Sequence, residues 1–386
     1  MAKMISNEQW KKTITDVETA FLYGTLDKVL FMQCPPGYSE IISELIKDGN
    51  ELMNETKNKE DIEYVMLKKS IYGLVQAARV WWKNLWKVLH AMRFEKCLND
   101  GCLFRRMDGL GEVIICAYVD DMLIVGDDNA VNDTHKELGD VFNITIEEAK
   151  EFLGCKWIRN ENSYWIHQPA ILKKIDNAFG EEVKCLKKYP TPSGEAFKVN
   201  KVRDGEPNLE KDKQNRYRSG IGMCLYLSRH SRPDICNATR ELSKGMVRAN
   251  DAHYKQMLRL IKYILTTKGL CLKQTTINGP WKITGLCDSD YAGDNDTRKS
   301  VTGYVIYLNG LIICWKSKGQ SIVTLSSTEA EYVAATDITT ELLFIKQVMK
   351  FLGMGMKDKM NIKIDNQGAL FLSKNEYACH RTKILM

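Results

Sequence analysis

The sequence lacks several features that are typical of secreted and membrane proteins. None of its hydrophobic runs approaches the roughly 18 uninterrupted apolar residues that a membrane-spanning helix requires. Its first residues, MAKMISNEQW, contain no apolar core of a signal peptide. The 12 cysteines include no C-x-x-C pair, and only six histidines accompany them. We therefore expect an intracellular protein with free thiols, without a zinc site.

Length and composition predict a globular protein with more than one domain. The 386 residues exceed an ordinary single domain. Contents of 44% hydrophobic and 27% charged residues are close to the globular average and exclude a disordered or fibrous chain. A net charge of +6 allows a nucleic-acid partner without requiring one.

The first half of the chain has the pattern of a mixed α/β fold. The apolar runs VIICAYV and MLIVG flank Asp120 and Asp121, which predicts a β-hairpin with the acidic pair at its tip. The segment FLGCKWIRNENSYWIHQ predicts a second hairpin that turns at residues 160–162. A predicted helix then begins at Pro169, and Gly180 is placed to cap it.

The second half predicts a linker, a helical region and a mixed sheet. Residues 185–213 hold three of the eight prolines and dense charge, which is typical of a linker. Helical patterns dominate residues 217–267. Strands are expected at WKITGLCD, SVTGYVIYL, GLIICWK and QSIVTL, then a helix over residues 327–352, a strand at NIKID and a helix from Asn366. This order predicts a separate domain.

The turn YVDD, from Tyr118 to Asp121, is the sharpest local signal. Neighbouring strand residues point to opposite faces, so two adjacent carboxylates converge only where the chain turns. Two ionised carboxylates about 4 Å apart repel by roughly 4 kcal/mol at an effective dielectric of 20, which favours a compensating cation. Mg²⁺ prefers such oxygen ligands, and its role would be two-metal phosphoryl transfer. The alternative is a solvated hairpin tip, since Asp is common in turns.

Longer motifs surround this turn in a fixed order. They are DVETAFLYG from Asp16, PPGY from residue 35, LKKSIYGLVQAARVWW from residue 67, and then YVDD. Together they resemble the reverse transcriptases of copia-type retrotransposons. The resemblance implies an α/β (α+β) fold with a reverse transcriptase palm followed by thumb and connection helices. It also implies RNA-directed DNA polymerase activity.

The resemblance implies roles for individual residues. Asp16, Asp120 and Asp121 would be the catalytic metal ligands. Phe21 would exclude a ribose 2′-OH, and Gln76 would contact the incoming nucleotide. The cofactor would be two Mg²⁺ ions per active site, with Mn²⁺ as a substitute, and the partners would be an RNA template, a DNA primer, RNA–DNA hybrid and dNTPs, with no membrane. Without the family, Phe21 and Gln76 fit packing and polar surface, and Asp16 fits a cap or turn.

A basic stripe lies in the helical region. Lys255, Arg259 and Lys262 recur at i, i+4 and i+7 on one face of a predicted helix. The region around them resembles the family's thumb and connection, so the stripe would grip phosphates of a primer–template duplex. Tyr118 would also contact substrate, beside the metal ligands. A solvated helix face is an equal alternative for the stripe.

The last part of the chain resembles the family's RNase H domain in LCDSDYAGD, LSSTEAEYVAA and IKIDNQGAL. The resemblance implies a second set of Mg²⁺ ligands, Asp288, Glu331 and Asp365, which would hydrolyse the RNA strand of a hybrid. Glu331 is preferred to Glu329 because E-Y-V-A fits the E-x-x-A helix pattern of RNases H. Asp290 stays open as an alternative to Asp288. Taken singly, each acid also fits a helix cap or a surface position.

The resemblance predicts four segments: reverse transcriptase palm and thumb start over 1–184, linker over 185–213, helical connection over 214–279 and RNase H-like domain over 280–386. Relatives place fingers ahead of the first motif and a fourth RNase H carboxylate at the other end, so we expect truncation at both ends. The alternatives are an inactive retroelement remnant that at most binds nucleic acid, or a product that does not fold. The family implies cytoplasmic retroelement particles with a nuclear phase.

Overall fold

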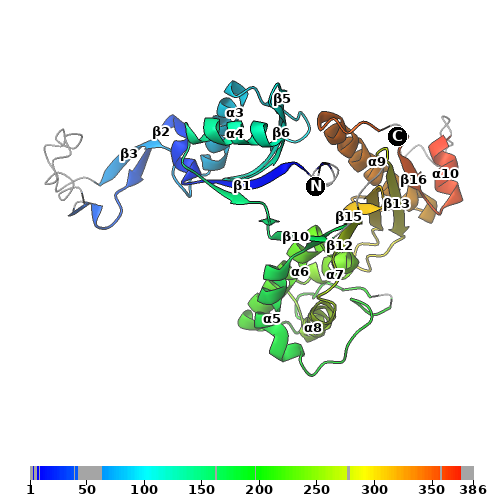
Figure 1. The fold of residues 1–386 in the computed structure, drawn as a ribbon. Helices are drawn as coiled ribbons and strands as arrows, with labels where there is room; N and C mark the ends of the chain where they lie inside the picture. Colours follow the sequence, from blue (N-terminus) through cyan, green and yellow to red (C-terminus); the bar gives the residue numbers. More distant parts are fainter. Residues whose placement is uncertain are drawn as a thin grey trace. The chain divides into compact units, whose positions relative to one another are not determined.

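A computed structural model describes residues 3, 7, 9–38, 40, 41, 63–160, 163–195, 197–275, 279–356 and 359–374 (Figure 1). The protein is mixed α/β, as predicted, and forms two compact units, one of residues 9–148 and one of residues 1–8 with 149–386. Residues 161 and 162 of the second predicted turn, and residues 375–386 of the last predicted segment, lie outside the described residues. No described helix combines the length and the apolar character that crossing a bilayer requires.

The unit of residues 9–148 is built on a six-stranded antiparallel sheet in the order β4-β5-β6-β7-β1-β8. The strands are β1 (Lys11–Val17), β4 (Glu95–Lys96), β5 (Leu103–Asp108), β6 (Gly111–Tyr118), β7 (Asp121–Gly126) and β8 (Ile144–Glu148). Two helices, α3 (Ala77–Ala91) and α4 (Asp128–Gly139), bury their apolar faces in one core with the sheet. This core holds the ends of the central strands in place.

The first predicted hairpin is confirmed. β6 and β7 pair from Val113↔Gly126 to Tyr118↔Asp121, which leaves Val119 and Asp120 as a two-residue turn. Such tight turns require positive φ, and Val119 has a φ of 58°. Before this hairpin, η1 (Ala20–Tyr23) leads into β2 (Thr25–Gln33), which pairs with β3 (Tyr64–Lys69) in a ribbon that extends away from the sheet (Figure 1).

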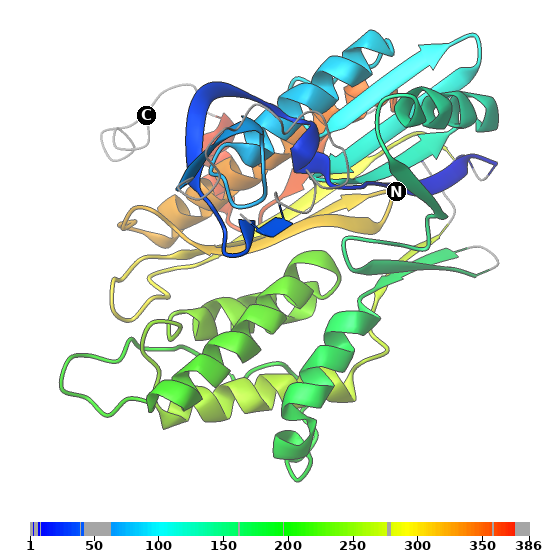
Figure 2. The same cartoon turned by 90° about the vertical axis from the view of Figure 1, so that its left-hand side faces the viewer.

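The second unit contains a four-stranded sheet and a helical layer. The sheet has the order β12-β11-β10-β9 and is formed by β9 (Glu151–Phe152), β10 (Cys155–Asn160), β11 (Ser163–His167) and β12 (Leu272–Thr275). The predicted second hairpin is confirmed by the pairing of β10 with β11. The helices share one core and lie side by side (Figure 2); they are α5 (Pro169–Val183), α6 (Lys211–His230), η3 (Pro233–Ile235), α7 (Cys236–Ser243) and α8 (Asp251–Thr266).

Two details of the helical layer differ from the sequence prediction. Gly180 does not cap α5, because the helix continues to Val183, whose side chain is buried in the core. Residues 185–195 and 197–210 of the predicted linker are irregular, but they do not form a spacer, because Val199 and Leu209 are only 3% and 6% exposed and belong to the helical core. Burial of these apolar side chains makes the segment part of the layer.

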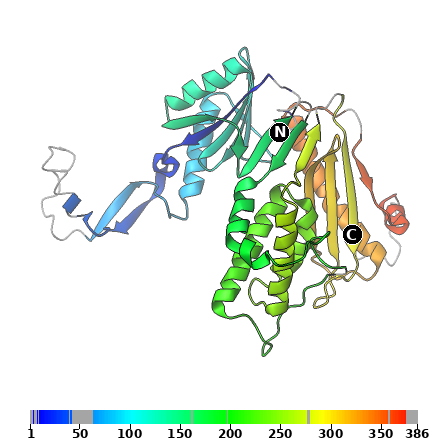
Figure 3. The same cartoon turned by 60° about the horizontal axis from the view of Figure 1, so that its bottom comes forward.

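A mixed sheet follows in the order β15-β14-β13-β16, in which β13 and β16 are parallel and the other pairs antiparallel. Its strands are β13 (Ile283–Asp290), β14 (Val301–Leu308), β15 (Leu311–Gly319) and β16 (Asn361–Lys363). The long helix α9 (Ser327–Phe351) packs on β13 and β14, and α10 (Gln367–Lys374) follows β16 (Figure 3). The predicted strand at QSIVTL is wrong. Buried Gln320 donates to Thr302 Oγ1 and to the carbonyl of Ala330, which draws the chain off the sheet towards α9.

Candidate metal centres

The first predicted centre lies where β1 and β7 meet. Asp16, near the end of β1, is the cross-strand partner of Asp121, the first residue of β7. Asp120 immediately precedes Asp121 in the turn. Side chains of directly opposed residues on one sheet face lie close together. The sheet register therefore brings together carboxylates that are separated by about a hundred residues in the chain.

The turn that carries Asp120 is held by two hydrogen bonds. The indole Nε1 of Trp81 donates to the carbonyl of Val119 at 2.6 Å, and the amide of Val17 donates to the carbonyl of Asp120 at 3.1 Å. Trp81 is only 2% exposed and sits in the core between α3 and the sheet. The sequence motifs do not predict this role for Trp81. Its position in the W-W pair that ends the LKKSIYGLVQAARVWW motif is the one available signal.

Two carboxylates of this centre have raised pKa values, partly because of each other's charge. Burial, followed by the charges of Asp120 and Glu18, raises the pKa of Asp16. Burial, followed by Asp120 and Asp16, raises the pKa of Asp121. A cation bound between them would relieve this repulsion, so the donor set fits a divalent metal.

The residues predicted to contact substrate lie in or beside η1, α3 and β6. Phe21 lies in η1 with its ring 4.7 Å from that of Tyr72. Gln76 immediately precedes α3, and its carbonyl accepts from the amide of Val80. Tyr118 ends β6 and is 56% exposed. These positions leave the predicted roles open.

The basic stripe of α8 is largely engaged by the chain itself. The Arg259 guanidinium lies over the ring of Tyr189, 4.5 Å from its centroid. Lys262 Nζ donates to the carbonyl of Lys184 at 3.0 Å. Lys255 is exposed. The three residues do share a helix, but two of them are held against residues 184–189.

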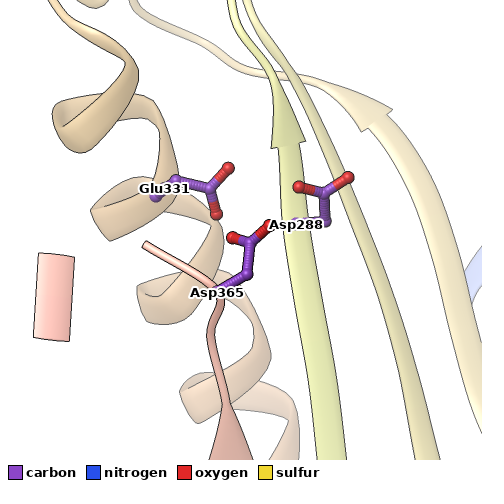
Figure 4. A group of neighbouring side chains, drawn as sticks. All are labelled: Asp288, Glu331 and Asp365. Carbon is purple, nitrogen blue, oxygen red and sulfur yellow. The ribbon is translucent and has the colours of Figure 1, made fainter. Parts of the chain in front are cut away.

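The second predicted centre is more tightly assembled. Asp288 comes from β13, Glu331 from α9 and Asp365 from the bend after β16. One ligand atom from each lies within 4.8 Å of the other two, and within the described part of the chain no other three acids, histidines or cysteines reach this spacing, the first centre included. Figure 4 shows the three carboxylates turned towards one another. Three carboxylates at this spacing match the oxygen ligands that Mg²⁺ prefers.

Glu331 is the buried member of this centre, with an exposed fraction of 5%. Its Oε1 accepts from the amide of Ser289 at 2.9 Å and from the Ser289 hydroxyl at 2.8 Å. Its Oε2 is buried and has no hydrogen-bond partner among the residues that the structure describes. Burial raises the pKa of Glu331, the Ser289 bonds oppose this, and the charges of Asp288 and Asp365 add to it. A buried carboxylate with one unpaired oxygen, grouped with two further acids, fits a cation site.

The competing acids have other partners. The Glu329 carboxylate accepts from the amide of Leu325 at 2.7 Å, and the Glu329 amide donates to Oγ of Ser326, the N-cap of α9. Asp290 forms an ion pair with Lys198. The structure therefore groups Asp288 rather than Asp290 with Glu331.

Comparison with known proteins gives consistent matches. Residues 1–191 match the family described as reverse transcriptase (RNA-dependent DNA polymerase). The chain is 32% identical over 378 residues to the retrovirus-related Pol polyprotein from transposon TNT 1-94 of Nicotiana tabacum, which covers 95% of this chain and 27% of the polyprotein. It is 29% identical over 385 residues to that from transposon RE1 of Arabidopsis thaliana, covering 98% of this chain and 24% of the polyprotein.

A shorter relative is matched over its whole length. The transposon Ty5-1 protein of Saccharomyces cerevisiae is 27% identical over 338 residues, which is 85% of this chain and 100% of that protein. Against the two plant polyproteins, the chain spans only about a quarter of their length.

Proposed function

The chain belongs to the reverse transcriptase family of copia-type Pol polyproteins, and from this premise we propose that it is an RNA-directed DNA polymerase. The observation that supports a working site is the register of β1 and β7, which sets Asp16 opposite Asp121 beside the Asp120 turn. Its substrates would be an RNA template, a DNA primer and dNTPs.

In this proposal, Asp16, Asp120 and Asp121 hold the metal from two adjacent strands and the turn between β6 and β7. Mg²⁺ bound there supplies charge stabilisation for the attacking and leaving oxygens of phosphoryl transfer. Trp81 acts by keeping the turn in place, because it anchors the carbonyl next to Asp120. Phe21 would contact the sugar of the incoming nucleotide and Gln76 the nucleotide itself, as expected from the family.

We also propose a ribonuclease H activity for residues 280–386. The supporting observation is the spacing of Asp288, Glu331 and Asp365, with ligand atoms within 4.8 Å of one another. The mixed sheet positions two of these acids and the helix packed on it positions the third. The site would hold Mg²⁺ and hydrolyse the RNA strand of an RNA–DNA hybrid. Retroelement particles in the cytoplasm, with a nuclear phase, are the location that this function implies.

One gel assay tests both activities. The full chain is incubated with a labelled RNA template carrying a recessed DNA primer, Mg²⁺ and four dNTPs, and primer extension and RNA cleavage are read together. We expect Asp120→Asn to abolish extension only and Asp365→Asn to abolish cleavage only. Asp140→Asn, an exposed acid of the first unit, and Asp290→Asn serve as matched controls that keep both activities.

The outcome also decides the alternative. Absence of both products, with clear binding of the hybrid in a gel-shift assay, would contradict the enzyme and leave a nucleic-acid-binding remnant. Loss of both activities in either Asn variant would contradict the assignment of two independent sites.

A further inference from the structure

One residue that is not itself an acid donates hydrogen bonds to the second candidate metal centre. We propose that Ser289 is a positioning residue that fixes Oε1 of Glu331 and thereby presents Oε2 to the bound metal. This inference rests on the proposed metal centre of Asp288, Glu331 and Asp365.

The two carboxylate oxygens of Glu331 differ in their hydrogen bonding. Oε1 accepts both hydrogen bonds that Ser289 offers, from the amide at 2.9 Å and from the hydroxyl at 2.8 Å. Oε2 has no partner in the described chain, although it is buried. A buried carboxylate oxygen without a partner is costly, so this oxygen is expected to have a ligand, and Glu331 lies in a group with two other acids that would share a cation.

The position of Ser289 on β13 places it on the face of the strand that packs against α9. Successive side chains of a strand point to opposite faces, so Ser289 shares a face with Cys287. Cys287 is buried in the core that also contains Ile338 and Leu342 of α9. Ser289 therefore faces the helix that carries Glu331. Asp288 thus supplies one proposed metal ligand, and its neighbour Ser289 supports a second, Glu331.

Of the two hydrogen bonds that Ser289 donates to Glu331, a substitution can remove the one from the hydroxyl. In Ser289→Ala the hydrogen bond from the backbone amide of residue 289 to Glu331 remains. A single hydrogen bond, however, leaves the Glu331 carboxylate able to rotate about that bond. Loss of a group that orients a metal ligand typically lowers metal affinity or activity 10–100-fold. Ser289→Thr keeps the hydroxyl and suits a strand, so it is the conservative variant.

A Mn²⁺-binding measurement tests the positioning role of Ser289 without requiring enzymatic activity. Free Mn²⁺ is measured by electron paramagnetic resonance as the full chain is titrated, and Glu331→Gln defines the signal that belongs to this centre. We expect Ser289→Ala to weaken the Glu331-dependent binding about tenfold and Ser289→Thr to restore it to within about twofold.

A matched control separates positioning from general stability. Ser300 is buried immediately before β14, where its hydroxyl contacts Thr324 Oγ1 at 2.8 Å and accepts from the amide of Ala292 at 3.0 Å. Ser300→Ala is expected to lower the melting temperature without changing Mn²⁺ affinity. Ser289→Ala is expected to change Mn²⁺ affinity with little effect on the metal-free melting temperature.

Two failures can be told apart. If the unaltered chain shows Glu331-dependent Mn²⁺ binding and Ser289→Ala binds within twofold of it, the positioning role is overturned while the metal centre stands. If the unaltered chain shows no Glu331-dependent binding, the proposed metal centre itself is overturned, and the role of Ser289 with it.

Discussion

Replacement of Glu331 by Gln is expected to stabilise the metal-free protein and to remove the part of its response to Mg²⁺ that comes from the centre of Asp288, Glu331 and Asp365. At the 4.8 Å limit of the cluster, each pair of charges repels by about 0.9 kcal/mol at the dielectric of water and by about 3.5 kcal/mol at an effective value of 20. Asp288 and Asp365 are exposed, so the lower figure applies, and two pairs give about 2 kcal/mol.

Two further effects of the substitution oppose each other. The variant removes the cost of burying a carboxylate, and it weakens the Ser289 bonds by about 1 kcal/mol because their acceptor becomes neutral. The net gain in the free energy of unfolding therefore stays near 2 kcal/mol. For a unit of this size, about 2–4 °C per kcal/mol corresponds to a melting temperature at least about 4 °C higher.

The pH dependence follows from the raised pKa of Glu331. The folded protein binds this proton more readily than the unfolded chain, whose ordinary value is 4.5. The destabilisation is therefore present above the folded pKa and is relieved as the pH falls through the folded pKa to below 4.5. The advantage of Glu331→Gln should accordingly shrink on acidification.

Thermal unfolding in EDTA and in Mg²⁺, at pH 7 and at pH 4, measures these effects. Glu329→Gln, on the same helix, is the matched control: it weakens the cap of α9 and keeps the Mg²⁺ response. The reasoning is refuted if Glu331→Gln melts below the unaltered chain in EDTA at pH 7, or if Mg²⁺ raises both melting temperatures equally.

Three further outcomes are expected. Trp81→Phe should lower the free energy of unfolding, measured in urea, by about 1–3 kcal/mol and reduce primer extension, because the Val119–Asp120 turn loses its indole donor. Trp82→Phe loses a similar hydrogen bond to the carbonyl of Gly101, away from this turn, and should keep extension. Burial and then Lys11 lower the pKa of His135 to about 4, so the contribution of His135 to the free energy of unfolding should fall by about 3 kcal/mol between pH 6.5 and 4. A His135→Gln variant whose stability changes with pH in that window as much as that of the unaltered chain would contradict this. Asp290→Asn should keep Mn²⁺ binding that Asp288→Asn loses, as read by the same resonance titration.

Local patterns in the sequence predicted much of the fold correctly. The alternation around Asp120 and Asp121 predicts the hairpin that forms, and the long amphipathic pattern after residue 327 predicts α9. Such elements are determined by backbone periodicity and turn chemistry, which are local properties. Errors arose where a distant contact decided the outcome. Gln320 leaves the sheet because it bonds to α9, and the predicted linker is not a spacer because its residues Val199 and Leu209 are buried in the helical core.

The sequence by itself determined which residues are predicted to carry the chemistry, because the motifs around Asp16, Asp120 and Glu331 stand in a recognisable order. Only the tertiary structure decided how they meet. The register of β1 on β7 opposes Asp16 to Asp121, and the packing of α9 on β13 sets Glu331 against Ser289. Registers and packing contacts depend on the burial of whole faces rather than on neighbours in the chain, so no local pattern could specify them.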